Sequence, residues 1–261
     1  MSRHRAAVRT FDEANRLASE ERDLLVEAPL VIEVEGVPPI TIMRTPGHDR
    51  ELVVGFLFTE GAIRGTEQIV MLSECPDASD RIRVRLAEGA SLDCLVRSGS
   101  SVSACGLCGR EAIENMLERL QRLPDGPTVS VDLLKRVPKT LRFAQDLFRS
   151  TGASHAVAAF DLEGELLEIQ EDVGRHNALD KLIGRSLLVE RPLTNSALML
   201  SGRASAEMVM KSVAAGARIV ASVSAPTSLA VELAERLNLT LCGFCRGKEG
   251  TIYAHPERVI A

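Results

Sequence analysis

Two cysteines in a run of small residues are the side chains of this sequence best suited to chemistry. Cys105 and Cys108 form a Cys-x-x-Cys pair within SGSSVSACGLCG, residues 98–109. Glycine and serine leave the backbone free to move and the thiols open to solvent. The next segment, GREAIENMLERL, repeats apolar residues at helical spacing, which places the second cysteine just before a helix N-terminus that favours a thiolate. The sequence therefore predicts a mobile loop that carries two activatable thiols.

The motif alone leaves three interpretations of this pair open. A Cys-x-x-Cys pair with reduced thiols can be half of a zinc site, a redox or sulfur-transfer pair, or an incidental pair. A thioredoxin-like site is disfavoured, because no strand of apolar residues leads directly into the pair.

A second pair, Cys242 and Cys245, raises the question of a four-cysteine zinc site. The surrounding LTLCGF has the pattern of a strand, in which Cys242 would pack as a small core residue. Successive side chains of a strand point to opposite faces, so the odd separation predicts that the two thiols face opposite ways. We therefore expect no zinc ion that bridges the two pairs.

Cytidine-deaminase chemistry is excluded by the order of the motifs. That chemistry needs H-x-E followed by P-C-x-x-C. Here Ala104 rather than proline precedes the first pair, and the only H-x-E, His255–Glu257, follows both pairs. A related fold is still compatible with the sequence.

Composition limits the classes of function further. The chain has 261 residues, of which 45% are hydrophobic and 26% charged, with a net charge of −5. These values are typical of a globular protein with one large or two modest domains. Mild acidity and only 3% aromatic residues argue against a nucleic-acid-binding surface. No apolar run reaches membrane-spanning length and no apolar signal segment is present, so we expect a cytoplasmic protein with reduced cysteines.

Apolar patterning divides the chain into three parts. Residues 1–26 are charged and weakly periodic and predict a frayed arm. Residues 27–123 predict a small α+β domain that ends in the cysteine loop and its helix. Its strands are expected at residues 27–34, 40–45, 81–86 and 92–96, with a helix that begins near Asp49.

Residues 124–261 follow a boundary rich in proline and glycine and predict an α/β domain. A long helix comes first, with Pro138 as a kink within it. Two strands then form a hairpin that turns at Glu163–Gly164, and three further helices each precede a short apolar strand. This alternation implies right-handed crossovers and a largely parallel sheet covered by helices.

Polar residues follow three of the predicted core strands, at the edge where ligands bind in such sheets. Small hydroxyls stand where helices begin and cations follow the last core strand, a combination that suits phosphate. Each serine could instead only cap its helix. The candidates are Ser201, Gly202, Arg203 and Ser205, then Thr227 and Ser228, then Phe244, Cys245, Arg246, Gly247, Lys248 and Glu249.

The segment EDVGRHNALDK, residues 171–181, concentrates polar groups at a strand-to-helix turn. A helix start needs only one capping side chain, so this turn is more polar than capping requires. We expect Asp172 and His176 to shape a cofactor pocket. His176 is not expected to bind a metal, because no second histidine lies at a ligand spacing.

Taken together, the motifs resemble the FdhD family of formate dehydrogenase accessory sulfurtransferases. They occur in order from about Glu27 to the C-terminus: SxSACGLCG, EDVGRHNALDK, SGRAS, SAPTSLAVELA, and GFCRG with YAHPERV. The resemblance implies a homodimer. It also implies an α/β chain with a three-layer, cytidine-deaminase-like C-terminal domain and a smaller α+β N-terminal domain.

The resemblance further implies a reaction. Such proteins take persulfide sulfur from a cysteine desulfurase and pass it to the bis-molybdopterin guanine dinucleotide form of the molybdenum cofactor, as formate dehydrogenase requires. Cys105 matches the family's persulfide-bearing cysteine, Cys108 its second loop cysteine, and Phe244–Glu249 its cofactor-binding segment. The extra Cys242 is not a family feature. It keeps open the alternative of a zinc-stabilised cofactor-binding chaperone without catalytic sulfur transfer.

Overall fold

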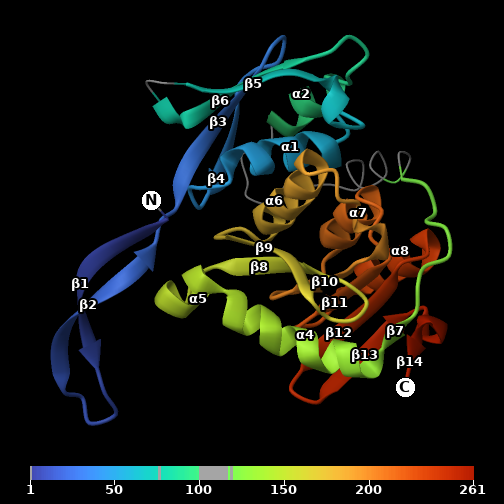
Figure 1. The fold of residues 1–261 in the computed structure, drawn as a ribbon. Coiled ribbons are helices and arrows are strands. Elements are labelled where there is room, and N and C mark those ends of the chain that lie inside the picture. The colour runs from blue at the N-terminus through green and yellow to red at the C-terminus, as the bar shows by residue number, and fades with distance from the viewer. Residues whose placement is uncertain (1, 76–77, 100–116, 118–119) are drawn as a thin grey trace.

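The computed structural model describes residues 2–75, 78–99, 117 and 120–261 (Figure 1). Cys105, Cys108 and most of the helix predicted after them therefore lie outside the described residues. None of the described helices is long and apolar enough to cross a membrane.

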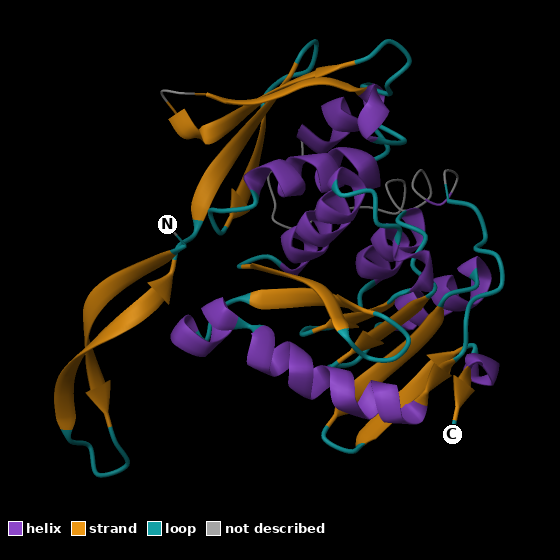
Figure 2. Cartoon of the chain, in the orientation of Figure 1, coloured by secondary structure: helices purple, strands orange, loops and turns teal. Residues whose placement is uncertain are grey.

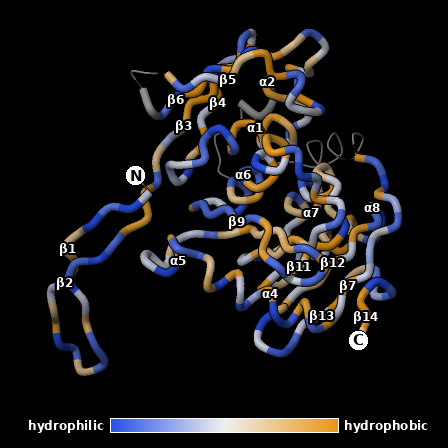
Figure 3. Tube along the Cα trace, viewed as in Figure 1, coloured by the Kyte–Doolittle hydropathy of each residue, from blue (hydrophilic) through white to orange (hydrophobic). Residues whose placement is uncertain are grey.

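Residues 3–25 form an antiparallel hairpin, so the prediction of a frayed arm is wrong. Strands β1 (Arg3–Phe11) and β2 (Leu17–Leu25) pair along their whole length. This N-terminal arm extends away from the body and is largely hydrophilic (Figures 1 and 3). Since most of its side chains are exposed, neither face is apolar, and the alternation that reveals a half-buried strand is missing.

A four-stranded sheet follows, in the order β4-β3-β6-β5. Its strands are β3 (Ala28–Val34), β4 (Ile40–Arg44), β5 (Ile69–Cys75) and β6 (Ala78–Leu86), and its helices are α1 (Asp49–Thr59) and α2 (Asp93–Gly99). The strand predicted at residues 92–96 is wrong, because this stretch is the start of α2. Cys94 and Leu95 are nevertheless buried in the core, and a short apolar run does not distinguish a buried strand from a buried helix.

The larger sheet has six strands in the order β13-β12-β11-β10-β8-β9. They are β8 (His155–Phe160), β9 (Leu166–Asp172), β10 (Ala197–Leu200), β11 (Ile219–Ser222), β12 (Thr240–Arg246) and β13 (Glu249–Ala254). Pairs β10–β11 and β11–β12 are parallel, whereas β12–β13, β10–β8 and β8–β9 are antiparallel. The prediction of a largely parallel sheet is therefore wrong, because a hairpin at each edge reverses the chain direction.

Helices cover both faces of this sheet (Figure 2). One face packs against α6 (Arg175–Leu188), α7 (Ala206–Ala214) and α8 (Ser228–Leu237). The other packs against α4 (Val131–Ala144), which is followed by the short α5 (Asp146–Thr151) and preceded by β7 (Val129–Ser130), the partner of β14 (Val259–Ile260). The single long helix predicted here is interrupted at Gln145, while Pro138 lies inside α4. The closer likeness to a cytidine deaminase stays a prediction.

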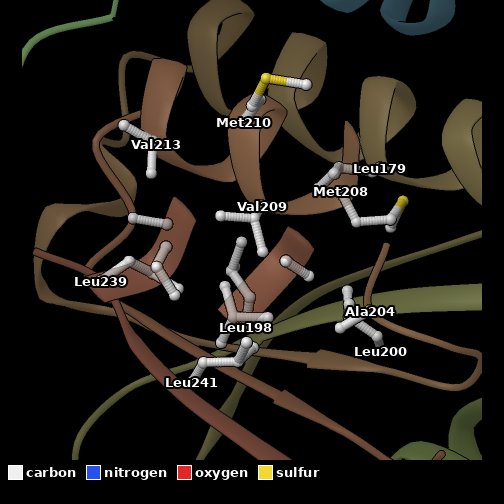
Figure 4. Close-up of a cluster of buried hydrophobic side chains, with 14 of the residues drawn as sticks. Leu179, Leu198, Leu200, Ala204, Met208, Val209, Met210, Val213, Leu239 and Leu241 are labelled. Atoms are coloured by element: carbon white, nitrogen blue, oxygen red, sulfur yellow. The ribbon is translucent and has the colours of Figure 1, made fainter. Parts of the chain in front are cut away.

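The core strands alternate between the two helical layers. Leu198 and Leu200 of β10 face α7, whose Val209 lies directly above the sheet (Figure 4). Ala197 and Met199 face the α4 side. Because the strands are packed between helices on both faces, the sheet is rigid. The residues at the ends of these strands are therefore held in fixed positions.

Two glycines bring the two sheets' helices into backbone contact. A Cβ atom at Gly55 of α1 would lie 1.8 Å from the carbonyl oxygen of Asp180 in α6. One at Gly184 of α6 would lie 1.9 Å from the carbonyl oxygen of Glu51. No side chain fits there, so α1 and α6 cross at the closest approach that helices allow.

Candidate functional site

The carboxyl ends of β10, β11 and β12 lie side by side. Ala204 and Pro226 form an isolated parallel bridge, and the amide of Thr227 donates to the carbonyl of Ala204 at 3.0 Å. The amide of Phe244 donates to the carbonyl of Ser224 at 3.1 Å. The structure thus brings together the three chain segments in which the sequence placed its phosphate-binding candidates. We call this region the strand-end edge.

The start of the antiparallel strand β8 adds a histidine to this edge. Ser201 Oγ accepts a hydrogen bond from the amide of Ala156 at 2.8 Å, and a Cβ at Gly202 would lie 3.2 Å from His155 Nδ1. Burial lowers the pKa of His155, and the nearby cations Arg175 and Arg203 lower it further. The sequence analysis missed His155 because it considered only residues that follow strands. Strand β8 runs antiparallel to β10, so the first residue of β8 lies at the strand-end edge.

Two polar atoms at this edge are buried without a hydrogen-bond partner in the described part of the chain. They are Ser205 Oγ and Arg175 Nε. Ser205 is the N-cap residue of α7, yet its side chain makes no capping bond, whereas Thr227 caps α8 by accepting from the amide of Ala230. Arg175 is the first residue of α6. A hydroxyl, a guanidinium and helix N-termini are donors suited to a phosphate group.

The candidate segment Phe244–Glu249 covers the end of β12, the turn at Gly247 and Lys248, and the first residue of β13. Phe244 adopts a left-handed conformation with φ of 53°, and the Arg246 guanidinium lies 5.5 Å from the centre of its ring. Gly247 also has a positive φ, of 64°, which closes the turn. Lys248 and Glu249 are exposed, so the segment offers accessible side chains of both charges.

The prediction that Cys242 and Cys245 face opposite sides is wrong. Both are buried in the same cluster, on the α4 side of the sheet. The pairing register of β12 with β13 shifts between Gly243 and Arg246. This bulge at Phe244 shifts the alternation of side chains by one residue, so Cys242 and Cys245 lie on the same face. Burial raises the pKa of Cys242 to about 12 and of Cys245 to about 11. Both thiols are therefore neutral at physiological pH. Within the described ranges no three His, Cys, Asp or Glu side chains are placed to hold a metal ion.

Asp172 is fully buried and bonded within the protein. Its carboxylate lies 2.7 Å from Lys181 Nζ and accepts hydrogen bonds from the amide of Thr45 at 3.0 Å and from Asn177 Nδ2 at 2.9 Å. These bonds tie the turn before α6 to the end of β4. The structure therefore gives Asp172 a structural role, and its place in a cofactor pocket stays a prediction.

His176 is also buried, with Nε2 3.2 Å from Glu207 Oε2. Glu207 lies in the first turn of α7. Burial raises its pKa, although the positive charge of Lys211 acts in the opposite direction. Neither Asp172 nor His176 points into solvent, and His176 lies one residue after Arg175 of the strand-end edge.

A second buried ion pair was not predicted from the sequence. Lys211 Nζ lies 2.7 Å from Asp180 Oδ2 and donates to Thr59 Oγ1 at 3.0 Å. Burial alone would lower the pKa of Lys211, but Asp180 and Glu60 outweigh it and raise the pKa. Lys211 does not belong to the apolar stripe of α7, so the sequence pattern gives no sign that it is buried. Only the fold reveals this ion pair.

The sequence and the fold both have known counterparts. The sequence model of the FdhD/NarQ family matches residues 25–260. The chain is 39% identical over 262 residues to the sulfur carrier protein FdhD of Mycobacterium tuberculosis, covering 94% of this chain and 95% of that protein. It is 43% identical over 247 residues to the sulfur carrier protein FdhD of Sulfolobus acidocaldarius, covering 93% of each.

A crystal structure has the same fold. It is that of a Desulfotalea psychrophila protein described as a formate dehydrogenase accessory protein, with a TM-score of 0.80 and 25% identity over all of both chains.

Proposed function

The chain belongs to the FdhD/NarQ family, and we propose that it is a sulfur carrier in the maturation of a formate dehydrogenase. The observation that carries this proposal is the strand-end edge. There Arg175 Nε and Ser205 Oγ are buried without a partner among the described residues, beside Arg203 and His155. Buried donors without partners are costly in a folded protein, and an anionic ligand would satisfy them.

The cargo proposed for this edge is the molybdenum cofactor in its bis-molybdopterin guanine dinucleotide form. Its pyrophosphate groups suit the helix N-termini that follow β10 and β11 and the guanidinium groups of Arg203 and Arg175. Phe244, exposed at 36%, and Arg246 on the adjoining hairpin supply a flat surface and a cation for the rest of the dinucleotide.

Sulfur transfer is assigned to Cys105 and Cys108, outside the described residues. The Cys105 thiolate attacks the outer sulfur of a persulfide on a cysteine desulfurase, so one S–S bond forms as another breaks and the desulfurase regains its thiol. The Cys108 thiolate then attacks the inner sulfur of the Cys105 persulfide. This step leaves a Cys105–Cys108 disulfide and releases the outer sulfur as sulfide toward the molybdenum.

Persulfide loading tests the sulfur-transfer half of the proposal. Incubation with a cysteine desulfurase and cysteine should add one sulfur atom to Cys105, detected by mass spectrometry of the peptide. Cys105→Ser should abolish loading, whereas Cys108→Ser should load and fail to release sulfide. Normal loading of Cys105→Ser would reverse the assignment. Stoichiometric zinc that is lost on mutating Cys242 would favour the zinc-stabilised chaperone instead.

Calorimetric titration with GDP tests the cargo half. A charge-assisted hydrogen bond to phosphate contributes about 1.5–3 kcal/mol, so Arg175→Gln and Arg246→Ala should each weaken GDP binding by roughly ten- to a hundredfold. Arg236→Ala is the matched control, because Arg236 is exposed in the last turn of α8, at the end away from the strand-end edge. Equal affinities of all three variants would remove the strand-end edge from the site.

A further inference from the structure

One imidazole at the strand-end edge makes no hydrogen bond within the described part of the chain. His155 begins β8, which lies between β9 and β10 in the larger sheet (Figure 1). Its side chain is half-buried, and neither ring nitrogen is bonded to another residue that the structure describes. Polar groups in protein interiors normally have a partner. The imidazole is therefore available to a ligand.

The ring of His155 lies directly against the chain at Gly202. A Cβ atom at position 202 would lie 3.2 Å from Nδ1 and 3.4 Å from Cε1 of the imidazole. The amide of Ser201 donates to the carbonyl of Ala156 at 3.0 Å, and Ser201 Oγ accepts from the amide of Ala156, so the two segments are fixed next to each other. The imidazole is thus held beside the loop that leads from β10 to Ser205.

Three charged groups from three different elements act on His155. Arg175 of α6 and Arg203 of the loop between β10 and α7 are cations, and Asp172 of β9 is an anion. The charge of Asp172 is already compensated by Lys181 Nζ at 2.7 Å. Burial and the two cations lower the pKa of His155 below its ordinary value of 6.5, so the imidazole is neutral at neutral pH in the ligand-free protein.

An anion that binds beside Arg175 and Arg203 reverses this balance. The negative charges of a pyrophosphate offset the two guanidinium groups, and an opposite charge close to the imidazole favours its protonated form. A protonated imidazole donates a charge-assisted hydrogen bond, which is stronger than a neutral one. Because the third positive charge forms only with the ligand, the empty edge avoids the repulsion of three clustered cations.

We propose that His155 is a binding residue of the strand-end edge that takes up a proton from solvent when a pyrophosphate binds there. This proposal rests on the proposed function, because the pyrophosphate is that of the proposed cargo. It adds a regulatory property to the site. The affinity for the cargo rises as the pH falls through the neutral range.

Calorimetry of the full chain with GDP-mannose tests the proposal. Both phosphates of this nucleotide sugar are esterified, as in the cargo, so the ligand itself does not titrate near neutral pH. Titrations in buffers of different ionisation enthalpy count the protons exchanged, and we expect uptake of up to about one proton per site at about pH 7. His155→Gln should bind without this uptake.

The pH dependence of the affinity is the second readout. At about pH 6 the parent protein should bind GDP-mannose about tenfold or more tightly than His155→Gln, whereas at about pH 8 the two should agree within about threefold, because both side chains are then uncharged. His4→Gln, the same substitution at an exposed position of the N-terminal arm, is the matched control and should behave like the parent protein.

The outcomes separate this proposal from the cargo proposal. Binding without proton uptake, or equal uptake by His155→Gln, would overturn this proposal and leave the cargo proposal intact. Absence of binding by the parent protein at every pH would overturn both, whereas persulfide loading of Cys105 is independent of either result. If His155→Gln does not fold, the imidazole NMR signals of His155 in the parent protein decide. They should move to the protonated form when the ligand is added near neutral pH, and unchanged signals would refute the proposal.

Discussion

At the scale of single residues, the buried ion pair of Asp172 and Lys181 fixes the turn before α6. Both side chains are almost fully buried, at 0% and 2% exposure. Removing one partner leaves the other charge buried without compensation, so Asp172→Asn should lower the free energy of unfolding by about 3–5 kcal/mol. Urea denaturation measures this. Glu168→Gln is the control, because its pair with Arg185 is partly exposed and should contribute about 1 kcal/mol or less. Equal losses in both variants would contradict the structural role of Asp172.

Glu207 makes stability depend on pH. Burial raises its pKa above the ordinary value of 4.5, so the folded state holds the proton more tightly than the unfolded state. The stability that this proton binding confers is complete below pH 4.5 and is lost as the pH rises through the raised value. Glu207→Gln should therefore gain stability relative to the parent protein between pH 4.5 and pH 8, by about 1.4 kcal/mol for each unit of the shift.

Urea denaturation at several pH values, read as the difference between the two proteins, checks this. The charged groups around Glu207 are His176, Lys211, Asp180, Glu60 and Arg175, all present in both proteins. A difference that does not change with pH would refute the assignment to Glu207.

At the scale of elements, the crossing of α1 and α6 depends on two glycines. Gly→Ala inside a helix ordinarily stabilises by roughly 0.5–1 kcal/mol. Here the new Cβ at Gly55 would overlap the backbone of α6, so Gly55→Ala should instead destabilise by about 1–3 kcal/mol or more. Thermal and urea unfolding measure the change. Arg50→Ala, at an exposed position in the same helix, is the control.

Strands were predictable where apolar and polar residues alternate along the sequence, because one face of such a strand packs against the core and the other faces solvent. Ile82 and Val84 of β6 are buried, whereas Arg83 and Arg85 beside them are exposed, as the pattern RIRVRL indicates. The arm carries no such signal, since both of its faces are polar. The two thiols on one face of β12 could not be predicted either. They depend on a positive φ at Phe244, which is rare for a residue that is not glycine.

The candidate site was predictable only as separate segments. Ser201–Ser205, Thr227–Ser228 and Phe244–Glu249 stand after apolar strands in the sequence, and this order suggested one edge. His155 could not be found in this way, because it begins a strand whose antiparallel direction is set by the whole sheet.

At the scale of the whole molecule, the N-terminal arm stands out among the described residues because most of its side chains are exposed. It is anchored at its base, where Ser2 Oγ donates to the carbonyl of Pro46 at 2.7 Å, and a two-stranded hairpin alone is marginally stable in water. Hydrogen exchange followed by mass spectrometry should show its amides exchanging far faster than those of β10 and β11. Exchange as slow as in those strands would mean that another protein surface covers the arm in solution.

Two of the buried ion pairs, Asp172–Lys181 and Asp180–Lys211, each have one partner in α6 and receive a hydrogen bond from the N-terminal half of the chain. Asp180 of α6 receives a hydrogen bond from Thr59 and Asp172 of β9 receives one from Thr45, so each carboxylate relies on a residue more than a hundred positions earlier. Chimeras between relatives that exchange only one half of the chain would therefore combine mismatched partners in a buried contact. The two halves are expected to have changed together in evolution, as one inherited unit.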